Sequence, residues 1–558
     1  MIVLGINGFK REHDPSAALI IDGKLMGFAE EERFIRVKRA SKKYPRNAIK
    51  WLLHENNLDI DDIDAFALGW DIPKLKEIEG YTNEFTDHIG DNNYMIQEIT
   101  GMKRTKKAEV VYVPHHTAHA AASYYASGND EASVIVIDGY GEDESISCYH
   151  GKGADLKLIR QWNKSFSLGC FFEGVSMYCG FTDWDAGKTM GLAAYANGDV
   201  LDDFIRWEND ELIILNKYKD LESNDITQVW FEQFSKYFGA RKPYKKEWLP
   251  IYNTYLPADR KEVEYFNPYA ASCAQETLVK LMDELIQYTI RETGSKHIVL
   301  GGGVALNCAA NGRLIKKYGQ YYVFPAAGDS GVSFGAAAYV AAQNGDQIEP
   351  INSALKGPKY KTDDIETFLL SCGIDFQRTE SPAQEAVKYL EDGRILGWFQ
   401  GRMEMGPRAL GARSIIARPI GNPGQDKVNN AKCRELWRPF APSMLYEEQE
   451  KMFDQDVKSR FMLLGLQCSK EAQNVFPEAI HVDNTSRPHT VIEEDGEYYN
   501  MLQLLKKETG HGIVLNTSFN GPAEPIVCSP RDALRMFYSS ELDVLLLDKF
   551  LIRKNGVK

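Results

Sequence analysis

Short apolar runs alternate with polar, glycine-containing loops from the start of the chain. The first run covers residues 2–7, and a second covers 16–21 and ends in Asp22–Gly23 before a third begins at Leu25. An Asp-Gly pair between two apolar runs is typical of a β-hairpin turn. We therefore expect a strand, a loop over residues 8–15 and then a two-stranded hairpin.

The same pattern returns about a hundred residues later along the chain. An apolar run over 133–138 is followed by a polar glycine loop at 139–142, a second run at 145–149 and a glycine turn at 151–153. Two such units predict a duplicated α/β domain with a cleft between its halves. Two unrelated hairpins are the alternative. Glycine-rich loops of this kind can offer backbone N–H groups to phosphate oxygens.

Two histidines and two aspartates form a candidate metal site. His115 and His119 lie one turn apart on the same face if a helix begins at residue 115, and Asp138 and Asp329 each follow an apolar run. Such a donor set suits iron, manganese or zinc. An HxxxH pair by itself is more often a surface or core pair, so ligation stays a hypothesis. His116 points elsewhere on the helix, and we interpret it as structural.

The periodicity lapses between Asn344 and Thr362, where glycine, proline, asparagine and lysine dominate. A chain of 558 residues is too long for one hydrophobic core. We therefore expect a first domain over residues 1–350 and a second over 357–558.

Arginines in the second domain occupy turns rich in glycine and proline, beside apolar strands. They are Arg402, Arg408, Arg413 and Arg438. A guanidinium group grips phosphate with two parallel hydrogen bonds, so this placement favours oxyanion clamps. Surface arginines paired with glutamates are the alternative.

Composition narrows the class of protein. Hydrophobic residues make up 44% and charged residues 26%, which is typical of a globular enzyme. The formal net charge of −14 argues against a general nucleic-acid binder. The nine cysteines are scattered without a CxxC pair, which indicates free thiols in a reducing cytosol. No run is long enough to span a bilayer. We expect a cytoplasmic enzyme with no nucleic-acid or membrane partner.

Several motifs follow one another along the chain: His13 in the first strand–loop–strand, the HHxxH segment, GKTMGLAAY, GGGVALN, GDSGVSFGAA, GRMEMGPRALGARSI, WRPFAPSM, and NTSFN with EPIV. Together they resemble the O-carbamoyltransferase family of nodulation and antibiotic biosynthesis. The resemblance covers essentially the whole chain. It implies an α/β protein with a duplicated actin/Hsp70-like (Kae1-like) N-terminal domain and an α+β YrdC-like C-terminal domain.

The resemblance also implies an activity. Carbamoyl phosphate and ATP, which Mg2+ can accompany, would form carbamoyl-adenylate in the YrdC-like domain. The Kae1-like site, with a divalent metal for which the resemblance favours Fe2+, would pass the carbamoyl group to a hydroxyl of a small-molecule acceptor. A homodimer is compatible with this activity. One alternative is threonylcarbamoyl-adenylate-dependent tRNA modification, against which the acidic balance counts. A binding module of the Hsp70 class is another, but it leaves the arginine-rich domain unexplained.

The same resemblance assigns roles to individual residues. His13 would deprotonate the acceptor hydroxyl, for which an unperturbed histidine pKa of ~6.5 is suitable. The implied metal ligands are His115, His119, Asp138 and Asp329. The implied nucleotide or adenylate contacts of the N-terminal site are Lys38, Gly302, Gly303 and Asn307. The implied carbamoyl phosphate and ATP contacts of the C-terminal site are Arg408, Lys432, Arg438, Arg487, Asn516 and Ser518.

Overall fold

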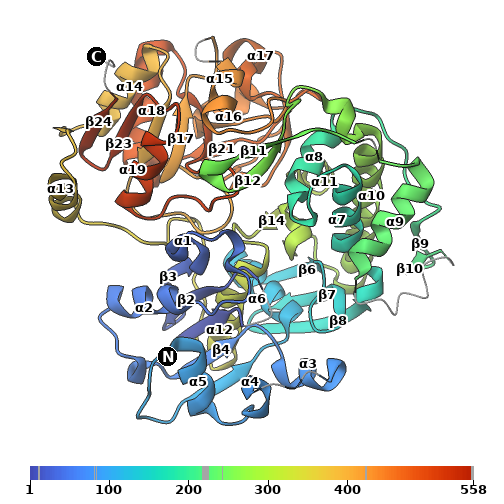
Figure 1. Cartoon of the computed structure of the whole chain (residues 1–558). Coiled ribbons are helices and arrows are strands. Elements are labelled where there is room, and N and C mark those ends of the chain that lie inside the picture. The colour runs from blue at the N-terminus through green and yellow to red at the C-terminus, as the bar shows by residue number, and fades with distance from the viewer. Residues whose placement is uncertain are drawn as a thin grey trace. The chain divides into compact units, whose positions relative to one another are not determined.

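The computed structural model describes residues 1–9, 13–80, 82, 84–215, 225–241, 243–421 and 424–554. Contacts between residues divide the chain into two units (Figure 1). The first unit consists of Met1–Lys242, Phe266–Ala310 and Leu314–Asn352. The second consists of Pro243–Tyr265, Asn311–Arg313 and Ser353–Lys558. The second unit therefore takes a segment from the middle of the chain.

Two sheets of identical topology form the first unit. The order of the first sheet is β3-β2-β1-β4-β5, in which β1, β2 and β3 are antiparallel neighbours and β1, β4 and β5 are parallel. Its strands are β1 (Ile2–Asn7), β2 (Ser16–Ile21), β3 (Lys24–Glu30), β4 (Ala65–Leu68) and β5 (Glu109–Tyr112). The predicted first hairpin is confirmed. Asp22 and Gly23 have φ of 48° and 80°, as a two-residue hairpin loop of the mirror-image turn type requires.

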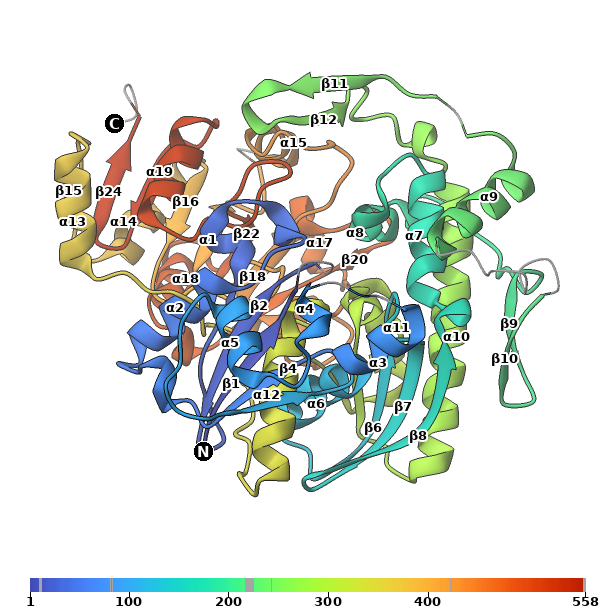
Figure 2. The same cartoon turned by 60° about the horizontal axis from the view of Figure 1, so that its bottom comes forward.

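The second sheet repeats this arrangement with the order β8-β7-β6-β13-β14, and Figure 2 shows β6, β7 and β8 as neighbouring strands. Its strands are β6 (Glu131–Ile137), β7 (Glu144–Lys152), β8 (Asp155–Asn163), β13 (Ile298–Gly301) and β14 (Tyr321–Val323). In both sheets a central strand has an antiparallel hairpin on one side and two parallel strands on the other. The predicted duplicated actin/Hsp70-like fold is confirmed.

Two helices rich in small residues cross closely in this unit: α6 (His115–Ser127) and α12 (Val332–Gln343). A Cβ atom at Gly335 of α12 would lie 1.8 Å from the carbonyl oxygen of Ala118 in α6. The glycine is therefore required by the close approach of two backbones. The remaining elements of the unit are α1 (Glu31–Ile35), α2 (Arg46–Glu55), α3 (Ile72–Glu79), α4 (Glu84–Asp87), α5 (Asn92–Thr100), α7 (Leu168–Tyr178), α8 (Ala186–Ala193), α9 (Ile226–Phe238), α10 (Pro268–Thr293), α11 (Cys308–Tyr318), β9 (Ile205–Glu208) and β10 (Glu211–Ile214).

The second unit is built on a mixed sheet with the order β15-β24-β23-β16-β17-β22-β18-β21. Strands β16 and β23, and β18 and β21, are parallel, while the other neighbouring pairs are antiparallel. Buried residues of α14, α18 and the sheet form one core, with Trp398 fully buried in it. This mixed sheet packed with helices is of the predicted α+β class.

The strands and helices of the second unit are as follows. The strands are β11 (Lys246–Leu249), β12 (Thr254–Pro257), β15 (Gln377–Arg378), β16 (Leu396–Phe399), β17 (Arg413–Ala417), β18 (Ala441–Leu445), β19 (Leu466–Gln467), β20 (Thr485–Ser486), β21 (His489–Val491), β22 (Ile513–Ser518), β23 (Val544–Leu547) and β24 (Phe550–Arg553). The helices are α13 (Thr362–Ser371), α14 (Pro382–Glu391), α15 (Gly424–Ala431), α16 (Tyr446–Met452), α17 (Ala472–Val475), α18 (Glu497–Thr509) and α19 (Pro530–Tyr538). None of the helices in the described part of the chain combines the length and the apolar character that a membrane crossing needs.

The crossing of α6 and α12 leads to a stability prediction. Replacing Gly335 with Ala should lower the free energy of unfolding by about 1–3 kcal/mol, because the added methyl group meets a backbone carbonyl that cannot rotate away. The matched control is Gly187→Ala in α8, where a Cβ atom would meet nothing within 4 Å. That change should be neutral or stabilising by up to about 1 kcal/mol. Urea unfolding of both variants tests the difference, and equal stabilities would contradict the close crossing.

Candidate functional site

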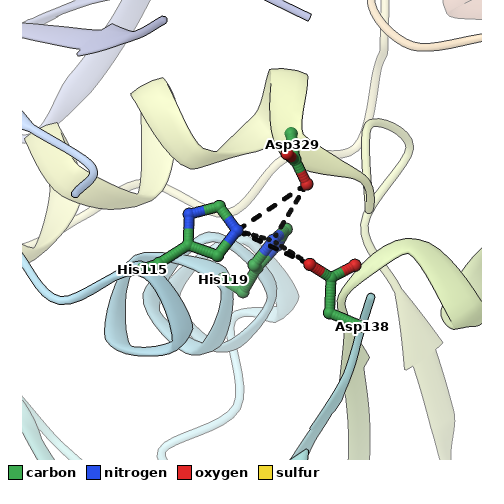
Figure 3. A group of neighbouring side chains, drawn as sticks. All are labelled: His115, His119, Asp138 and Asp329. Atoms are coloured by element: carbon green, nitrogen blue, oxygen red, sulfur yellow. Dashed lines mark hydrogen bonds and ion pairs between the residues drawn. The ribbon is translucent and has the colours of Figure 1, made fainter. Parts of the chain in front are cut away.

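The candidate metal centre forms where one helix start meets two strand ends. The first turns of α6 place His115 and His119 on the same helix face. Asp138 directly follows β6, and Asp329 opens the short turn η8 (Asp329–Gly331) between β14 and α12. Because β6, β13 and β14 run parallel, their carboxyl ends share one edge of the sheet. Figure 3 shows the four side chains pointing toward one another.

The distances within this group match those between ligands of one ion. The Nε2 atoms of His115 and His119 are 3.1 Å apart. Asp138 Oδ2 lies 3.5 and 3.6 Å from these two nitrogens, and Asp329 Oδ1 lies 3.7 and 3.6 Å from them. Donors bound at about 2.1 Å to one ion stand about 3–4 Å apart. The four donor atoms lie within 4.8 Å of one another, and within the described residues no other such group was found.

Because the four side chains are buried, the pKa of each one depends strongly on the charges of the others. Burial by itself raises the pKa of Asp138, but hydrogen bonds from His115 and His119 outweigh it and hold that pKa well below its usual value. Conversely, burial lowers the pKa of His115, whereas its contacts with Asp138 and Asp329 raise it well above the ordinary value. Two buried carboxylates need positive charge beside them. A divalent ion would meet this need by displacing the imidazole protons.

Neighbouring groups orient the donor atoms. Nδ1 of His115 lies 3.2 Å from the carbonyl oxygen of Gly69 and can donate its proton there, which leaves Nε2 directed at the cluster. The indole of Trp70 stacks on the His115 ring with centroids 3.8 Å apart. The N–H of Gly303 donates to Asp138 Oδ1 at 2.6 Å, so Oδ2 faces the histidines. These contacts hold the donor atoms toward the centre of the cluster.

His116 is directed away from this group. Its Nδ1 lies 2.8 Å from the hydroxyl oxygen of Ser147 in β7, and burial lowers the pKa of His116 to about 3. The side chain is a neutral, buried imidazole held by the second sheet. This arrangement agrees with the structural role inferred from the helical spacing.

His13, the predicted base, lies beside the cluster. Its Nε2 is 3.6 Å from Asp329 Oδ2, and its Nδ1 is 3.0 Å from Asp14 Oδ2. Burial lowers the pKa of His13, but Asp329 and Asp14 outweigh burial and raise it to about 9. The assumption of an unperturbed pKa was therefore wrong, because two carboxylates flank the ring. Any cation held by Asp329 opposes this shift.

The predicted nucleotide contacts of the first unit differ in their surroundings. Gly302 has φ of 86°, and a Cβ atom there would lie 2.3 Å from the carbonyl oxygen of Ile137. Glycine is therefore required at this position, which lies beside the candidate metal cluster. Lys38 is exposed in the turn η1 (Lys38–Ala40). The amide of Asn307 caps α11 through Ala310 N–H at 3.0 Å and pairs with Gln275 at 3.1 and 2.9 Å.

In the second unit, two of the predicted contact residues, Lys432 and Ser518, are joined by hydrogen bonds, and a third, Asn516, bonds to the residue after Arg408. Asn516 Nδ2 donates to the carbonyl oxygen of Ala409, the residue after Arg408, at 3.0 Å. Lys432 Nζ donates to the backbone carbonyl of Ser518 and, at 3.3 Å, to its hydroxyl oxygen. Strand β22 carries Asn516 and Ser518, so the segment that follows Arg408 and the side chain of Lys432 are both attached to this strand.

Three arginines lie close together in the same unit. Burial lowers the pKa of the Arg434 guanidinium well below its usual value, and the positive charges of Arg438 and Arg487 lower it further. Glu435 lies 3.4 Å from Arg438 and offsets part of this charge. A concentration of cations of this kind favours an anionic ligand.

Arg413 is a correction to the sequence interpretation. Its side chain is fully buried, and its guanidinium donates to the carbonyl oxygens of Gln400, Gly401, Ala412 and Pro358 at 2.8–3.3 Å. The group also stacks over Phe399 at 3.6 Å. Glu404 Oε1 accepts backbone N–H groups from the same loop at 2.8–3.3 Å. Arg413 therefore holds the loop in shape and is no oxyanion clamp.

Sequence reasoning missed several residues that shape the first site. Asp14 contacts the base, Trp70 supports a histidine, and both carboxylate oxygens of Glu142 accept the His115 backbone N–H at 3.1 Å. Trp70 comes two residues after an apolar run, which is a position where strand ends carry functional groups. Asp14 is adjacent to His13, and an Asp beside a candidate base could have been tested as its partner.

Comparisons with known proteins find two family profiles and several relatives that match this chain. The family profile described as Carbamoyltransferase N-terminus matches residues 3–338, and the one described as Carbamoyltransferase C-terminus matches residues 387–554. Nodulation protein NolNO of Sinorhizobium fredii is 30% identical over 97% of this chain and 79% of its own length. Nodulation protein NolO of Bradyrhizobium diazoefficiens is 32% identical over 79% of this chain and 78% of its own length. The solved structure of HypF from T. kodakarensis is 13% identical and covers 62% of this chain and 48% of its own, with a TM-score of 0.32, which is too low to support an argument.

The metal hypothesis predicts the metal content of variants. His119→Asn and Asp329→Asn should each lower affinity for Fe2+, Mn2+ or Zn2+ by at least about tenfold, since each removes a donor from a four-donor set. The matched control is His150→Asn, because His150 of the same unit pairs with Glu131 at the surface, 2.7 Å away. Elemental analysis after incubation and dialysis measures the bound metal. Wild-type protein that retains none of the three metals would contradict the hypothesis.

Proposed function

This chain belongs to the carbamoyltransferase family, and we propose that it performs ATP-dependent O-carbamoylation in two steps at two sites. The second unit forms carbamoyl-adenylate from carbamoyl phosphate and ATP. The first unit transfers the carbamoyl group to a hydroxyl of a small-molecule acceptor. The observation that carries the proposal is the convergence of His115, His119, Asp138 and Asp329 beside His13. We assign these roles to domains spanning residues 1–350 and 357–558.

The adenylation step joins two anionic substrates. Carbamoyl phosphate loses its phosphate to water, and an oxygen of the resulting carbamate attacks the α-phosphorus of ATP and displaces pyrophosphate. The cations must hold both substrates in line against their mutual repulsion. Arg408, Lys432, Arg438 and Arg487 supply positive charge for this purpose, Asn516 and Ser518 position the loops that carry two of them, and Mg2+ accompanies ATP.

The transfer step needs a base and a good leaving group. The acceptor oxygen attacks the carbamoyl carbon, the hydroxyl proton passes to Nε2 of His13, and AMP leaves. Lys38 and the Gly302–Gly303 backbone are proposed to contact the adenylate; Asn307 supports the latter by capping the next helix. His115, His119, Asp138 and Asp329 would hold a divalent ion, for which we propose Fe2+. When bound, it would supply Lewis acidity toward the carbamoyl oxygen or the adenylate phosphate.

The acceptor that we propose is a hydroxylated natural product, as in nodulation or antibiotic biosynthesis. The relatives that carry the name nodulation protein support this class. All nine cysteines are free thiols, which supports a reducing cytoplasm as the place of action. The homodimer stays a prediction. The tRNA alternative is disfavoured by the net charge of −14, and salt-dependent binding of tRNA would revive it.

His13→Asn should abolish carbamoyl transfer while pyrophosphate release that depends on carbamoyl phosphate continues. The amide cannot take the hydroxyl proton, but the second unit is untouched. Loss of a general base costs about 10²–10⁴-fold in rate. Product mass spectrometry and a pyrophosphate assay on the same samples measure both steps. If transfer survives at the wild-type rate, His13 is not the base.

Arg438→Ala should reduce adenylate formation by about 10²–10³-fold, since a group that stabilises developing charge is lost. The control, Arg378→Ala, removes an arginine of the same unit that pairs with Glu366 at the surface, 3.0 Å away, and should leave the rate unchanged. Synthetic carbamoyl-adenylate supplied to the Arg438 variant should restore transfer. Failure of that rescue would overturn the division into two sites.

A further inference from the structure

His13 has a carboxylate partner on each side of its ring. Nδ1 lies 3.0 Å from Asp14 Oδ2, while Nε2 points toward Asp329 and the candidate metal cluster. A neutral imidazole carries one N–H, and the group that accepts its hydrogen bond decides which nitrogen bears it. Asp14 can only accept when ionised, so it favours the proton on Nδ1. The lone pair then remains on Nε2, at the side of the cluster.

The backbone of this loop is tied to the candidate metal ligands. Asn7, buried at the end of β1, donates from Nδ2 to the carbonyl oxygen of Asp14 at 3.0 Å. Its Oδ1 accepts the indole N–H of Trp70 at 2.9 Å, and that indole stacks on His115. Contacts through Asn7 and Trp70 therefore connect Asp14 to His115 in α6. They set the position of Asp14 relative to the cluster.

Arg39 restrains the carboxylate from the other side. Its Nη1 lies 3.4 Å from Asp14 Oδ2, and its carbonyl oxygen accepts the Asp14 N–H at 2.8 Å. The guanidinium lies over the Trp184 ring at 4.0 Å, and the same ring meets the edge of His13 with centroids 4.8 Å apart. Asp14 and Arg39 have φ of 51° and 63°, a conformation that L side chains rarely adopt. Strain held in this way is common where a catalytic geometry is fixed.

We propose that Asp14, restrained by Arg39, is a positioning residue that holds His13 in the tautomer with a free Nε2. The inference rests on the proposed function of His13 as the base. During transfer, the proton of the acceptor hydroxyl moves to Nε2 as the new C–O bond forms and the bond to AMP breaks. The Nδ1 proton stays in its hydrogen bond to Asp14, which remains ionised throughout, as in a triad in which the carboxylate orients and stabilises the imidazole.

Asp14→Asn tests the proposal with little change in size. The asparagine amide can donate to Nδ1 and so favours the tautomer with the proton already on Nε2. Transfer from supplied carbamoyl-adenylate should fall about 10²–10⁴-fold in kcat, with KM changed less than about threefold. The matched control is Asp22→Asn, because Asp22 also has a positive φ of 48° but pairs with the N-terminal amine. That control should transfer at the wild-type rate.

Two further measurements separate positioning from a structural effect. The double variant His13→Asn/Asp14→Asn should be no slower than His13→Asn alone, because Asp14 acts only through His13. Bound metal in Asp14→Asn should equal that of the wild type. Wild-type transfer by Asp14→Asn, a further loss in the double variant, or loss of metal from Asp14→Asn would each overturn the inference. If His13→Asn itself keeps transferring, the role of His13 as the base fails and the inference falls with it, while the absence of any transfer by the wild type would overturn the proposed function.

Discussion

Two carboxylates, Asp138 and Asp329, are buried within a few ångströms of each other, and the first unit is organised around the positive charge that they require. Like charges this close in a low-dielectric interior repel strongly unless a cation lies between them or beside them. The two imidazoles of α6 meet this need when protonated, and a divalent ion meets it when they are neutral. This requirement explains why the pKa values of the two histidines are raised and those of the two aspartates are lowered.

The parallel part of the second sheet is what brings the carboxylates together. Parallel strands β6, β13 and β14 end at one edge, and the close crossing of α6 and α12 sets the histidines against the start of α12. Backbone groups then orient the donors, with Gly69 accepting from His115 and Gly303 donating to Asp138. Asp14, the residue after His13, is connected to the same group of side chains through Asn7 and Trp70. The candidate metal centre and the proposed base are thus held by connected contacts.

In the second unit, one arginine shapes a loop while other arginines keep their charge partly exposed. Arg413 lies in the core and donates its hydrogen bonds to backbone carbonyl oxygens. Its charge is therefore unavailable to an anion. Arg438 and Arg487 remain partly exposed, and their positive charges help to lower the pKa of the neighbouring Arg434. Both kinds of arginine occur beside glycine and proline in the sequence. Only the depth at which each side chain lies distinguishes them.

The sequence by itself determined the elements whose signals are local. The alternation of apolar runs and glycine turns predicted the repeated strands, the Asp22–Gly23 turn predicted the first hairpin, and the i, i+4 spacing placed His115 and His119 on one face. Ordered motifs supplied the family. The tertiary structure decided what depends on distant neighbours. It raises the pKa of His13, and it buries Arg413 so that this arginine cannot grip an anion. It also makes Asn307 a helix cap and includes Pro243–Tyr265 in the second unit. The physical reason is that charge, burial and packing are set by residues tens to hundreds of positions away, where periodicity carries no information.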